Sequence, residues 1–186
     1  GDNDEVPHSL IVNSFDELFI LGTTSSFNFP HSNNCFDSTF NGGTANNLTN
    51  GLGVNYTNGS DIIVSHLSSD GSTLMGSTFV GGSLNDGLNS TSAISSQNVL
   101  RYNYADEIRG EIDIDKNNNV YIVSSTQSSA DFPIEGNSFQ QNYGGGEIDA
   151  CIIKLDNSLS NIIWSSYLGG EKHDAGYSLS IDSNDD

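Results

Sequence analysis

The stretch DACIIKLDNSLSNIIWSSYLGG, residues 149–170, decides the fold of this chain, because a similar stretch, DIIVSHLSSDGSTLMGSTFVGG, occurs earlier at residues 61–82. The two stretches align without a gap when residue numbers are shifted by 88, so that Asp61 meets Asp149 and the terminal Gly-Gly pairs coincide. Self-similarity at a fixed spacing is the sequence signature of a repeat architecture. The chain is therefore predicted to contain two copies of one structural unit.

A second pair of similar segments lies between the strands of each unit. Residues 27–43, FNFPHSNNCFDSTFNGG, correspond to residues 129–146, SADFPIEGNSFQQNYGGG, with a shift of 103. The larger shift arises from an insertion at residues 44–58, which has the Asn-, Gly- and Thr-rich composition of a surface loop. A second insertion occupies residues 88–108. Insertions into repeats usually map to loops on one face, often the binding face.

The apolar residues alternate with period two and are bounded by Gly, Ser and Asn clusters, which favours short β-strands over helices. Each unit is predicted to hold four antiparallel strands, which is typical of a β-propeller blade. The fold class is therefore all-β. The expected strands are residues 8–13, 17–24, 61–68 and 73–80 in the first unit, and 110–115, 119–126, 149–156 and 161–168 in the second.

These strands divide the chain into two blades and the start of a third. Residues 1–82 form the first blade with the loop insertion 44–58, and residues 83–170 form the second with the loop insertion 88–108. Residues 171–186 supply the first strand of a following blade. Propellers usually have four to eight blades. The sequence is therefore expected to be a fragment of a larger propeller, whose remaining blades follow in cis or come from self-association.

Composition excludes several classes of partner. Five basic residues stand against 24 acidic ones, giving a net charge of −19, so binding to nucleic acid is not expected. No run of 18 apolar residues is present, so membrane insertion is not expected either. The N-terminal residues lack the basic and apolar regions of a signal peptide. The two cysteines, Cys35 and Cys151, occupy non-equivalent repeat positions and imply no disulfide framework.

The motifs resemble those of the SBBP-type β-propeller repeat family of bacterial extracellular proteins. The resemblance rests on GGG-x-x-DA-x4-LD at 144–156, YLGG at 167–170, the hairpin sequence D-x-NNNVYIVSST within 113–126, and SADFP at 129–133. It covers the chain apart from the insertions, which look like the version found in large surface proteins of Bacteroidetes associated with type 9 secretion. The resemblance implies a propeller fold and an extracellular or cell-surface location.

One pattern is a candidate calcium site. The spacing D-x-N-x-N/D places oxygen-bearing side chains at alternate positions of a short loop, as a hard cation requires. The alternative is a hairpin turn, in which Asn and Asp tolerate left-handed backbone. The first unit breaks the pattern with Val12, Ser14 and Asp16, and no other cofactor is expected. The calcium candidates are Asp115, Asn117, Asn119, Asp182, Asn184 and Asp186.

Two pairs of aspartates recur in both units. Asp86 and Asp174 follow the Gly-Gly pairs, where they either cap the following turn or line a central channel. Asp61 and Asp149 are expected to mark strand starts rather than to act in catalysis.

The second insertion carries the candidate binding residues Arg101, Tyr102 and Tyr104. Arg and aromatic residues are enriched at binding hot spots. A loop aromatic can instead pack onto its own blade, and both alternatives stay open.

The sequence thus favours a non-enzymatic propeller segment of a secreted or cell-surface bacterial protein, acting as a structural scaffold or an adhesive module. Its expected ligand is a protein or glycan at the cell surface. The alternative is part of a propeller enzyme that acts on extracellular polysaccharide, with carboxylates such as Asp86 and Asp174 at the channel.

Overall fold

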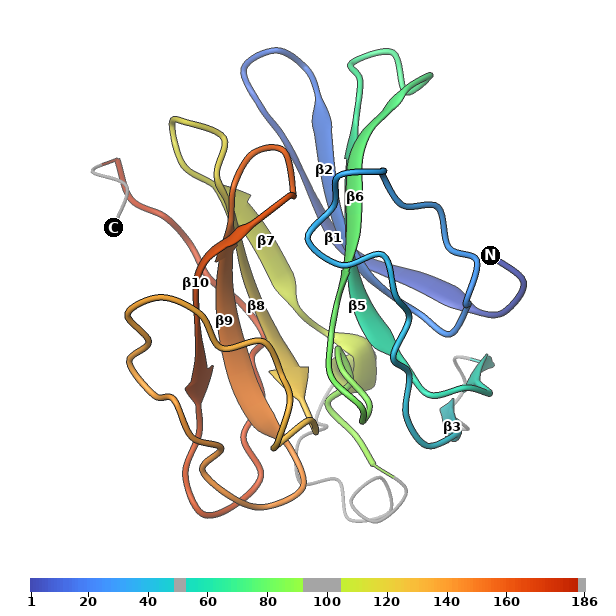
Figure 1. Cartoon of the computed structure of the whole chain (residues 1–186), viewed down its shortest axis with the longest axis vertical. Coiled ribbons are helices and arrows are strands. Elements are labelled where there is room, and N and C mark those ends of the chain that lie inside the picture. Colours follow the sequence, from blue (N-terminus) through green and yellow to red (C-terminus); the bar gives the residue numbers. More distant parts are fainter. Residues whose placement is uncertain (49–52, 92–104, 184–186) are drawn as a thin grey trace.

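The computed structural model describes residues 1–48, 53–91 and 105–183. Two four-stranded antiparallel sheets dominate it, with no closed barrel, and they face one another (Figure 1). The first sheet has the order β1 (Glu5–Val12), β2 (Leu18–Thr24), β5 (Asp61–Leu67) and β6 (Leu74–Val80). The second has the same order with β7 (Glu111–Ile114), β8 (Val120–Thr126), β9 (Asp149–Leu155) and β10 (Ile162–Leu168). The all-β prediction and the four strands of each unit are confirmed.

The tight turns of the two sheets are equivalent. Asp16 and Asn118 have φ of 61° between the first two strands of each sheet. Gly71 and Leu159 have φ of 69° and 57° between the last two strands. Left-handed backbone suits Gly, Asn and Asp and is costly for Leu. Leu159 adopts it because its side chain is fully buried in the main core.

The main core lies between the sheets. Ile62, Val64 and Val80 of the first sheet pack with Ile153 and Leu155 of the second. The first strands of the two sheets are also in contact, since the Ser9 hydroxyl donates a hydrogen bond to the Glu111 carboxylate. Burial of branched and aromatic side chains on both inner faces is the main force that holds the sheets together.

The ladder registers define which residues of the two units are equivalent. Thr24 pairs with Asp61, and Thr126 pairs with Asp149, so β2 and β8 correspond with a shift of 102. Glu5 pairs with Thr24 at the start of β1, and Asp86 forms an isolated bridge with Thr126. The second insertion therefore interrupts the first strand of the second sheet, near the position where β1 has a bulge between Pro7 and Ser9.

The first insertion is more ordered than the loop that its composition predicts. It forms a small hairpin of β3 (Asn46–Leu48) and β4 (Val54–Tyr56). The described end of the second insertion forms the 3₁₀ helix η1 (Asp106–Ile108). A second, smaller core joins the two insertions through Leu48, Tyr56, Leu88 and Ile108. The alternating buried residues Leu48 and Tyr56 explain why this polar segment forms strands.

The strand expected over residues 171–186 is not present in its described part. Residues 171–183 contain no strand, although the Ile181 amide donates a 2.9 Å hydrogen bond to Asp113 Oδ2. A strand needs a ladder partner, and the described residues offer no equivalent of β2 or β8 to pair with this segment. Across the described ranges, no helix is long and apolar enough to cross a bilayer.

Candidate functional site

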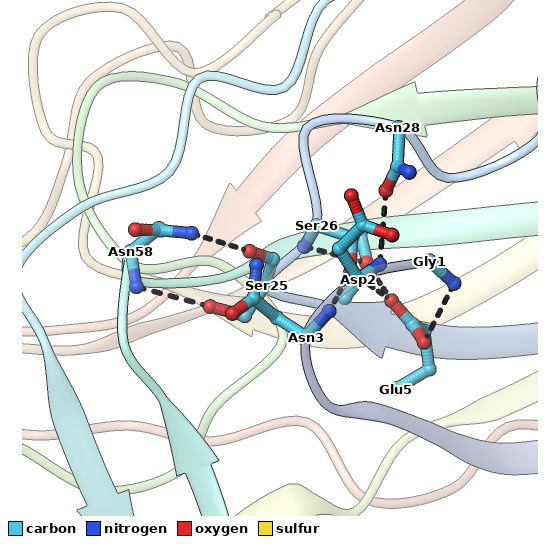
Figure 2. A network of polar contacts seen from close by, with 9 residues as sticks. Gly1, Asp2, Asn3, Glu5, Ser25, Ser26, Asn28 and Asn58 are labelled. Carbon is cyan, nitrogen blue, oxygen red and sulfur yellow. Dashed lines mark hydrogen bonds and ion pairs between the residues drawn. The ribbon is translucent and has the colours of Figure 1, made fainter.

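Both aspartates that follow the Gly-Gly pairs cap their turns. The amide of Gly82 donates to Asp86 Oδ2 at 2.8 Å, and the amide of Gly170 donates to Asp174 Oδ2 at 2.8 Å. The turn-capping alternative is thus confirmed at both positions. A third copy begins the chain, where the nitrogen of Gly1 lies 2.9 Å from Glu5 Oε2 (Figure 2). We call the three segments Gly1–Glu5, Gly82–Asp86 and Gly170–Asp174 the junction turns.

The junction turn Gly82–Asp86 joins the first sheet to the second. The Ser128 hydroxyl donates to Asp86 Oδ2 at 3.0 Å and accepts the amide of Leu84 at 3.0 Å. Both carboxylate oxygens of Asp131 accept the amide of Ser83 at 3.1 Å. These contacts hold the end of β8 against the segment that leaves β6.

The first junction turn repeats these contacts within the first unit (Figure 2). The amide of Asn3 donates to Ser26 Oγ at 2.8 Å, and the amide of Asp2 donates to Asn28 Oδ1 at 2.9 Å. The Ser26 hydroxyl donates to the Glu5 carboxylate. This copy was not predicted from the sequence, although the pattern G-x-x-x-D/E is shared by all three segments.

The strand-start aspartates also bind backbone. Asp61 accepts the amides of Asn41 at 2.7 Å and Gly42 at 3.0 Å, and Asp149 accepts the amide of Gly144 at 2.6 Å. Burial raises the pKa of Asp61 to about 7, against the lowering effect of its two amide donors. Burial likewise raises the pKa of Asp86 well above its usual value. Their amide contacts give these carboxylates a structural role.

The calcium candidate Asp115 lies in a hairpin turn. Its Oδ1 accepts the amides of Asn117 and Asn119, both at 2.9 Å, and its Oδ2 lies 3.2 Å from Lys154 Nζ. Partial burial acts to raise the pKa of Asp115, but the hydrogen bonds from Asn119 and Lys154 outweigh it and lower the pKa. Asn13 accepts the amides of Phe15 and Glu17 in the same way in the first unit.

The calcium candidate Asn119 also contacts Asp115 through its side chain, since Asn119 Nδ2 donates to Asp115 Oδ2 at 2.8 Å. The second loop with this pattern, at residues 182–186, is described only in part. Asp182 is exposed, while Asn184 and Asp186 lie outside the described residues. Within the described ranges, no group of three His, Cys, Asp or Glu side chains has the arrangement that a metal needs. Calcium binding stays a prediction.

The insertions hold each other and the sheet through a polar network. The Tyr56 hydroxyl lies 2.6 Å from Thr23 Oγ1, which lies 3.1 Å from His8 Nε2. Burial lowers the pKa of His8 to about 3, so its imidazole is neutral at ordinary pH.

The side-chain amide of Asn89 donates to the carbonyls of Asp106 at 2.8 Å and Arg109 at 2.9 Å. Asn89 thus ties together the two described ends of the second insertion. The predicted binding residues Arg101, Tyr102 and Tyr104 lie outside the described residues.

A polar pocket of about 330 Å³ lies where the insertions and the two units meet. Its walls are held by hydrogen bonds. Asn46 Nδ2 donates to the Ser90 carbonyl at 3.1 Å, Asn85 Nδ2 donates to the Thr44 carbonyl at 3.0 Å, and the Thr91 hydroxyl donates to the Glu147 carboxylate. The lining residues are Thr44, Ala45, Asn46, Leu84, Asn85, Thr91, Gln127 and Glu147.

This pocket belongs to only one junction and is not repeated along the described chain. Thr44, Asn46 and Thr91 come from the insertions, which differ between the units, and Glu147 takes the place of Gly59 in the first unit. Gln127 and Glu147 could not be found from the sequence, since Gln127 belongs to no motif and Glu147 holds a variable position of GGG-x-x-DA. Amide and hydroxyl groups beside one carboxylate suit a neutral, hydroxyl-rich ligand and disfavour an anion.

Comparison with protein-family models gives no match, and comparison with curated proteins gives none either.

Proposed function

We propose that this chain is a non-enzymatic β-propeller segment of a secreted or cell-surface bacterial protein, and that it binds a neutral glycan at the polar pocket between its insertions. The observation that carries the proposal is the contrast between the repeated and the unrepeated residues. Asp61, Asp86, Asp149 and Asp174 recur and bind backbone amides. The unrepeated insertions converge on the pocket.

The propeller part of the proposal rests on the shape of the pair and on the motif resemblance. The first strands β1 and β7 contact each other, as expected of strands nearest the axis of a propeller. The combined motifs GGG-x-x-DA, YLGG and SADFP support an SBBP-type repeat and, with it, an extracellular location.

Glycan binding is tested by titrating the whole chain with a panel of neutral and acidic oligosaccharides in a calorimeter. We expect a neutral oligosaccharide to bind, and Gln127→Ala to weaken it by roughly tenfold, since one lost hydrogen bond to a buried polar partner is worth about 1.4 kcal/mol. Ser158→Ala, on the exposed turn between β9 and β10 and outside the pocket lining, is the matched control. Equal binding by the Gln127 variant and the wild type would contradict the pocket as the site.

The role of Arg101, Tyr102 and Tyr104 is tested by a triple substitution to Ala. Deleting all of 88–108 would also remove Leu88 and Ile108 from the smaller core, so it cannot separate binding from folding. We expect the triple variant to keep the wild-type melting temperature and to bind the oligosaccharide more weakly. Unchanged affinity would assign these residues to packing.

The enzyme alternative has one observation in its favour. A Cβ placed on Gly81 would lie 2.8 Å from both Asp61 Oδ1 and Asp86 Oδ2, so two carboxyl groups with raised pKa values lie close together beside this glycine. Both residues are fully buried, however, and bind backbone amides. Release of reducing sugar from any polysaccharide by the wild type, lost in Asp86→Asn, would favour the enzyme.

A further inference from the structure

The interface between the two sheets shows which residues of each repeat pack against the neighbouring repeat. On the first sheet, the side chains of Val64 and Val80 are fully buried against the second sheet, and Phe36 packs against the same core. The amide of Phe36 donates to the carbonyl of Leu159 at 2.9 Å. Every residue of this face has an equivalent on the second sheet.

The equivalent face of the second sheet is uncovered. Phe139 takes the place of Phe36 and is 86% exposed, and Leu168 takes the place of Val80 and is 44% exposed. Together with Ile152 and Trp164 they line an apolar pocket of about 400 Å³. We call this the donor face.

The opposite face of the first sheet is also uncovered. Leu10 is 59% exposed and Val12 is 48% exposed, whereas their equivalents in β7, Ile112 and Ile114, belong to the main core or pack against it. This face has an apolar pocket of about 290 Å³. We call it the acceptor face. Its pocket-lining residues include Pro7, Ile20, Phe29, Pro30, Ile63, Leu67 and Leu74.

The two uncovered faces are complementary at the position where the internal interface is most tightly packed, which is the contact between Gly76 and the turn at Leu159. Inside the chain, Gly76 of β6 accommodates the turn of the second sheet, since a Cβ on Gly76 would lie 3.0 Å from the Ser158 carbonyl and 3.5 Å from Leu159 Cδ1. On the donor face the residue equivalent to Gly76 is Trp164, which would collide with a leucine. On the acceptor face the residue equivalent to Leu159 is Gly71, and a Cβ there would meet nothing within 4 Å. The internal interface thus pairs a glycine in the strand with a leucine in the turn, whereas the two uncovered faces offer a tryptophan in the strand and a glycine in the turn.

We propose that the donor face of one chain docks onto the acceptor face of a second copy of this chain, with Trp164 seated over Gly71. The contact reproduces the internal interface between repeats. It involves none of the residues that line the polar pocket, so it does not depend on glycan binding. The amide of Phe139 then reaches the carbonyl of the partner's Gly71, as Phe36 reaches Leu159 inside the chain. Such a head-to-tail contact either closes into a ring or grows into a filament.

The C-terminal residues compete for part of this surface. Gly176 donates to Ser125 Oγ at 3.1 Å, and Ile181 donates to Asp113 Oδ2 at 2.9 Å, so residues 176–181 run beside β7 and β8. The equivalent position beside β1 is occupied by β7. A second copy would bring its own β1 there, and docking therefore displaces residues 175–183. Residues 175–183 form no strand ladder, so their displacement breaks no ladder hydrogen bonds.

The proposal is tested by sedimentation equilibrium on the full chain and on a variant lacking residues 175–186, over a concentration series extending to the millimolar range. We expect reversible association, and tighter association when the competing segment is removed. Gly71→Leu places a side chain where Trp164 must lie, and should weaken association by roughly tenfold or more. Leu159 shows that leucine is tolerated at this turn position.

The decisive measurement is the double variant Gly71→Leu/Trp164→Gly, which recreates the Gly76–Leu159 pair of the internal interface. We expect it to associate more tightly than Gly71→Leu alone. Ile163→Gly is the matched control, because Ile163 precedes Trp164 on β10, is 44% exposed and does not line the donor-face pocket. A monomeric state of both the full chain and the shortened chain would overturn the proposal, as would failure of the double variant to restore association while its melting temperature stays normal.

Discussion

Gly81 lies beside two buried carboxyl groups, and its lack of a side chain leaves room for both. The Cβ of an alanine there would lie 2.8 Å from oxygens of both Asp61 and Asp86. Asp61 holds the amide of Gly42 in the connection between β2 and β5, and Asp86 holds the amide of Gly82 at the start of the connection between the sheets. A small residue and two buried carboxyl groups thus form one structural unit.

Substitution of Gly81 tests this arrangement. Gly81→Ala should destabilise the chain by about 1–3 kcal/mol, because the new methyl group overpacks a site bounded by two fixed side chains. Chemical denaturation followed by circular dichroism measures the loss. Gly170→Ala is the control, since a Cβ there would lie 3.9 Å from Asp174 Oδ2 and meet nothing closer. An equal loss in both variants would contradict the steric explanation.

The raised pKa of Asp61 makes a defined contribution to stability against pH. Its folded-state pKa of about 7 exceeds the usual 3.8, so the folded chain binds more protons between these values than the unfolded chain. This contribution to stability is complete below the unfolded pKa and is lost as pH rises to about 7. Carbon-13 titration of the Asp61 carboxyl should give a midpoint near neutrality, and a midpoint near 4, where a solvent-exposed carboxyl titrates, would refute it.

The two thiols should differ in reactivity. Cys151 is fully buried, and burial raises the pKa of its thiol well above the usual value, while Cys35 is partly exposed. Since the thiolate is the reactive species, Ellman's reagent should label one thiol in the folded chain and both in denaturant. Rapid labelling of both thiols without denaturant would show that the β9 region opens readily.

At the scale of elements, the two insertions form a unit of their own. The β3–β4 hairpin supplies Leu48 and Tyr56 to the smaller core, and the second insertion supplies Leu88 and Ile108. Neither insertion has a sufficient apolar face alone. Their mutual packing fixes the walls that the insertions contribute to the polar pocket.

Tyr56 separates packing from hydrogen bonding in this small core. Tyr56→Phe should cost about 1 kcal/mol, through loss of the 2.6 Å hydrogen bond to Thr23. Tyr56→Leu should cost more, because a fully buried ring is replaced by a smaller side chain. Thermal unfolding by calorimetry gives both values, and an equal loss would place the whole contribution of Tyr56 in the hydrogen bond.

The eight main strands could be predicted because their alternation and their repetition point to the same elements. The β3–β4 hairpin could not be predicted, because its few apolar residues stand among Asn, Gly and Thr, and its partner core comes from a distant insertion. The pocket residues Gln127 and Glu147 could not be predicted either, since only the fold brings them together. The strand expected over residues 171–186 is absent from its described part, residues 171–183, because strand formation depends on a partner as well as on the sequence pattern.

At the scale of the whole molecule, the two sheets form one cooperative structure around a shared core. Ile153→Ala removes a fully buried side chain from that core and should cost about 2–5 kcal/mol. The fluorescence of Trp164, the only tryptophan, and the far-ultraviolet circular dichroism should report the same transition, since loss of the shared interface unfolds both sheets. Separate transitions would show that the sheets are independent domains.

The junction turns also explain how a chain built from these repeats could gain or lose a whole repeat during evolution. The first two junction turns each bind a segment that follows the second strand of a sheet. The first turn binds Ser26 and Asn28 after β2, and the second turn binds Ser128 and Asp131 after β8. If a tandem duplication starts at one junction turn and ends at the next, the inserted unit carries both a junction turn and the segment that binds one. Chains built this way can gain or lose units without inventing a new connection, and the insertions are then free to diverge in each copy.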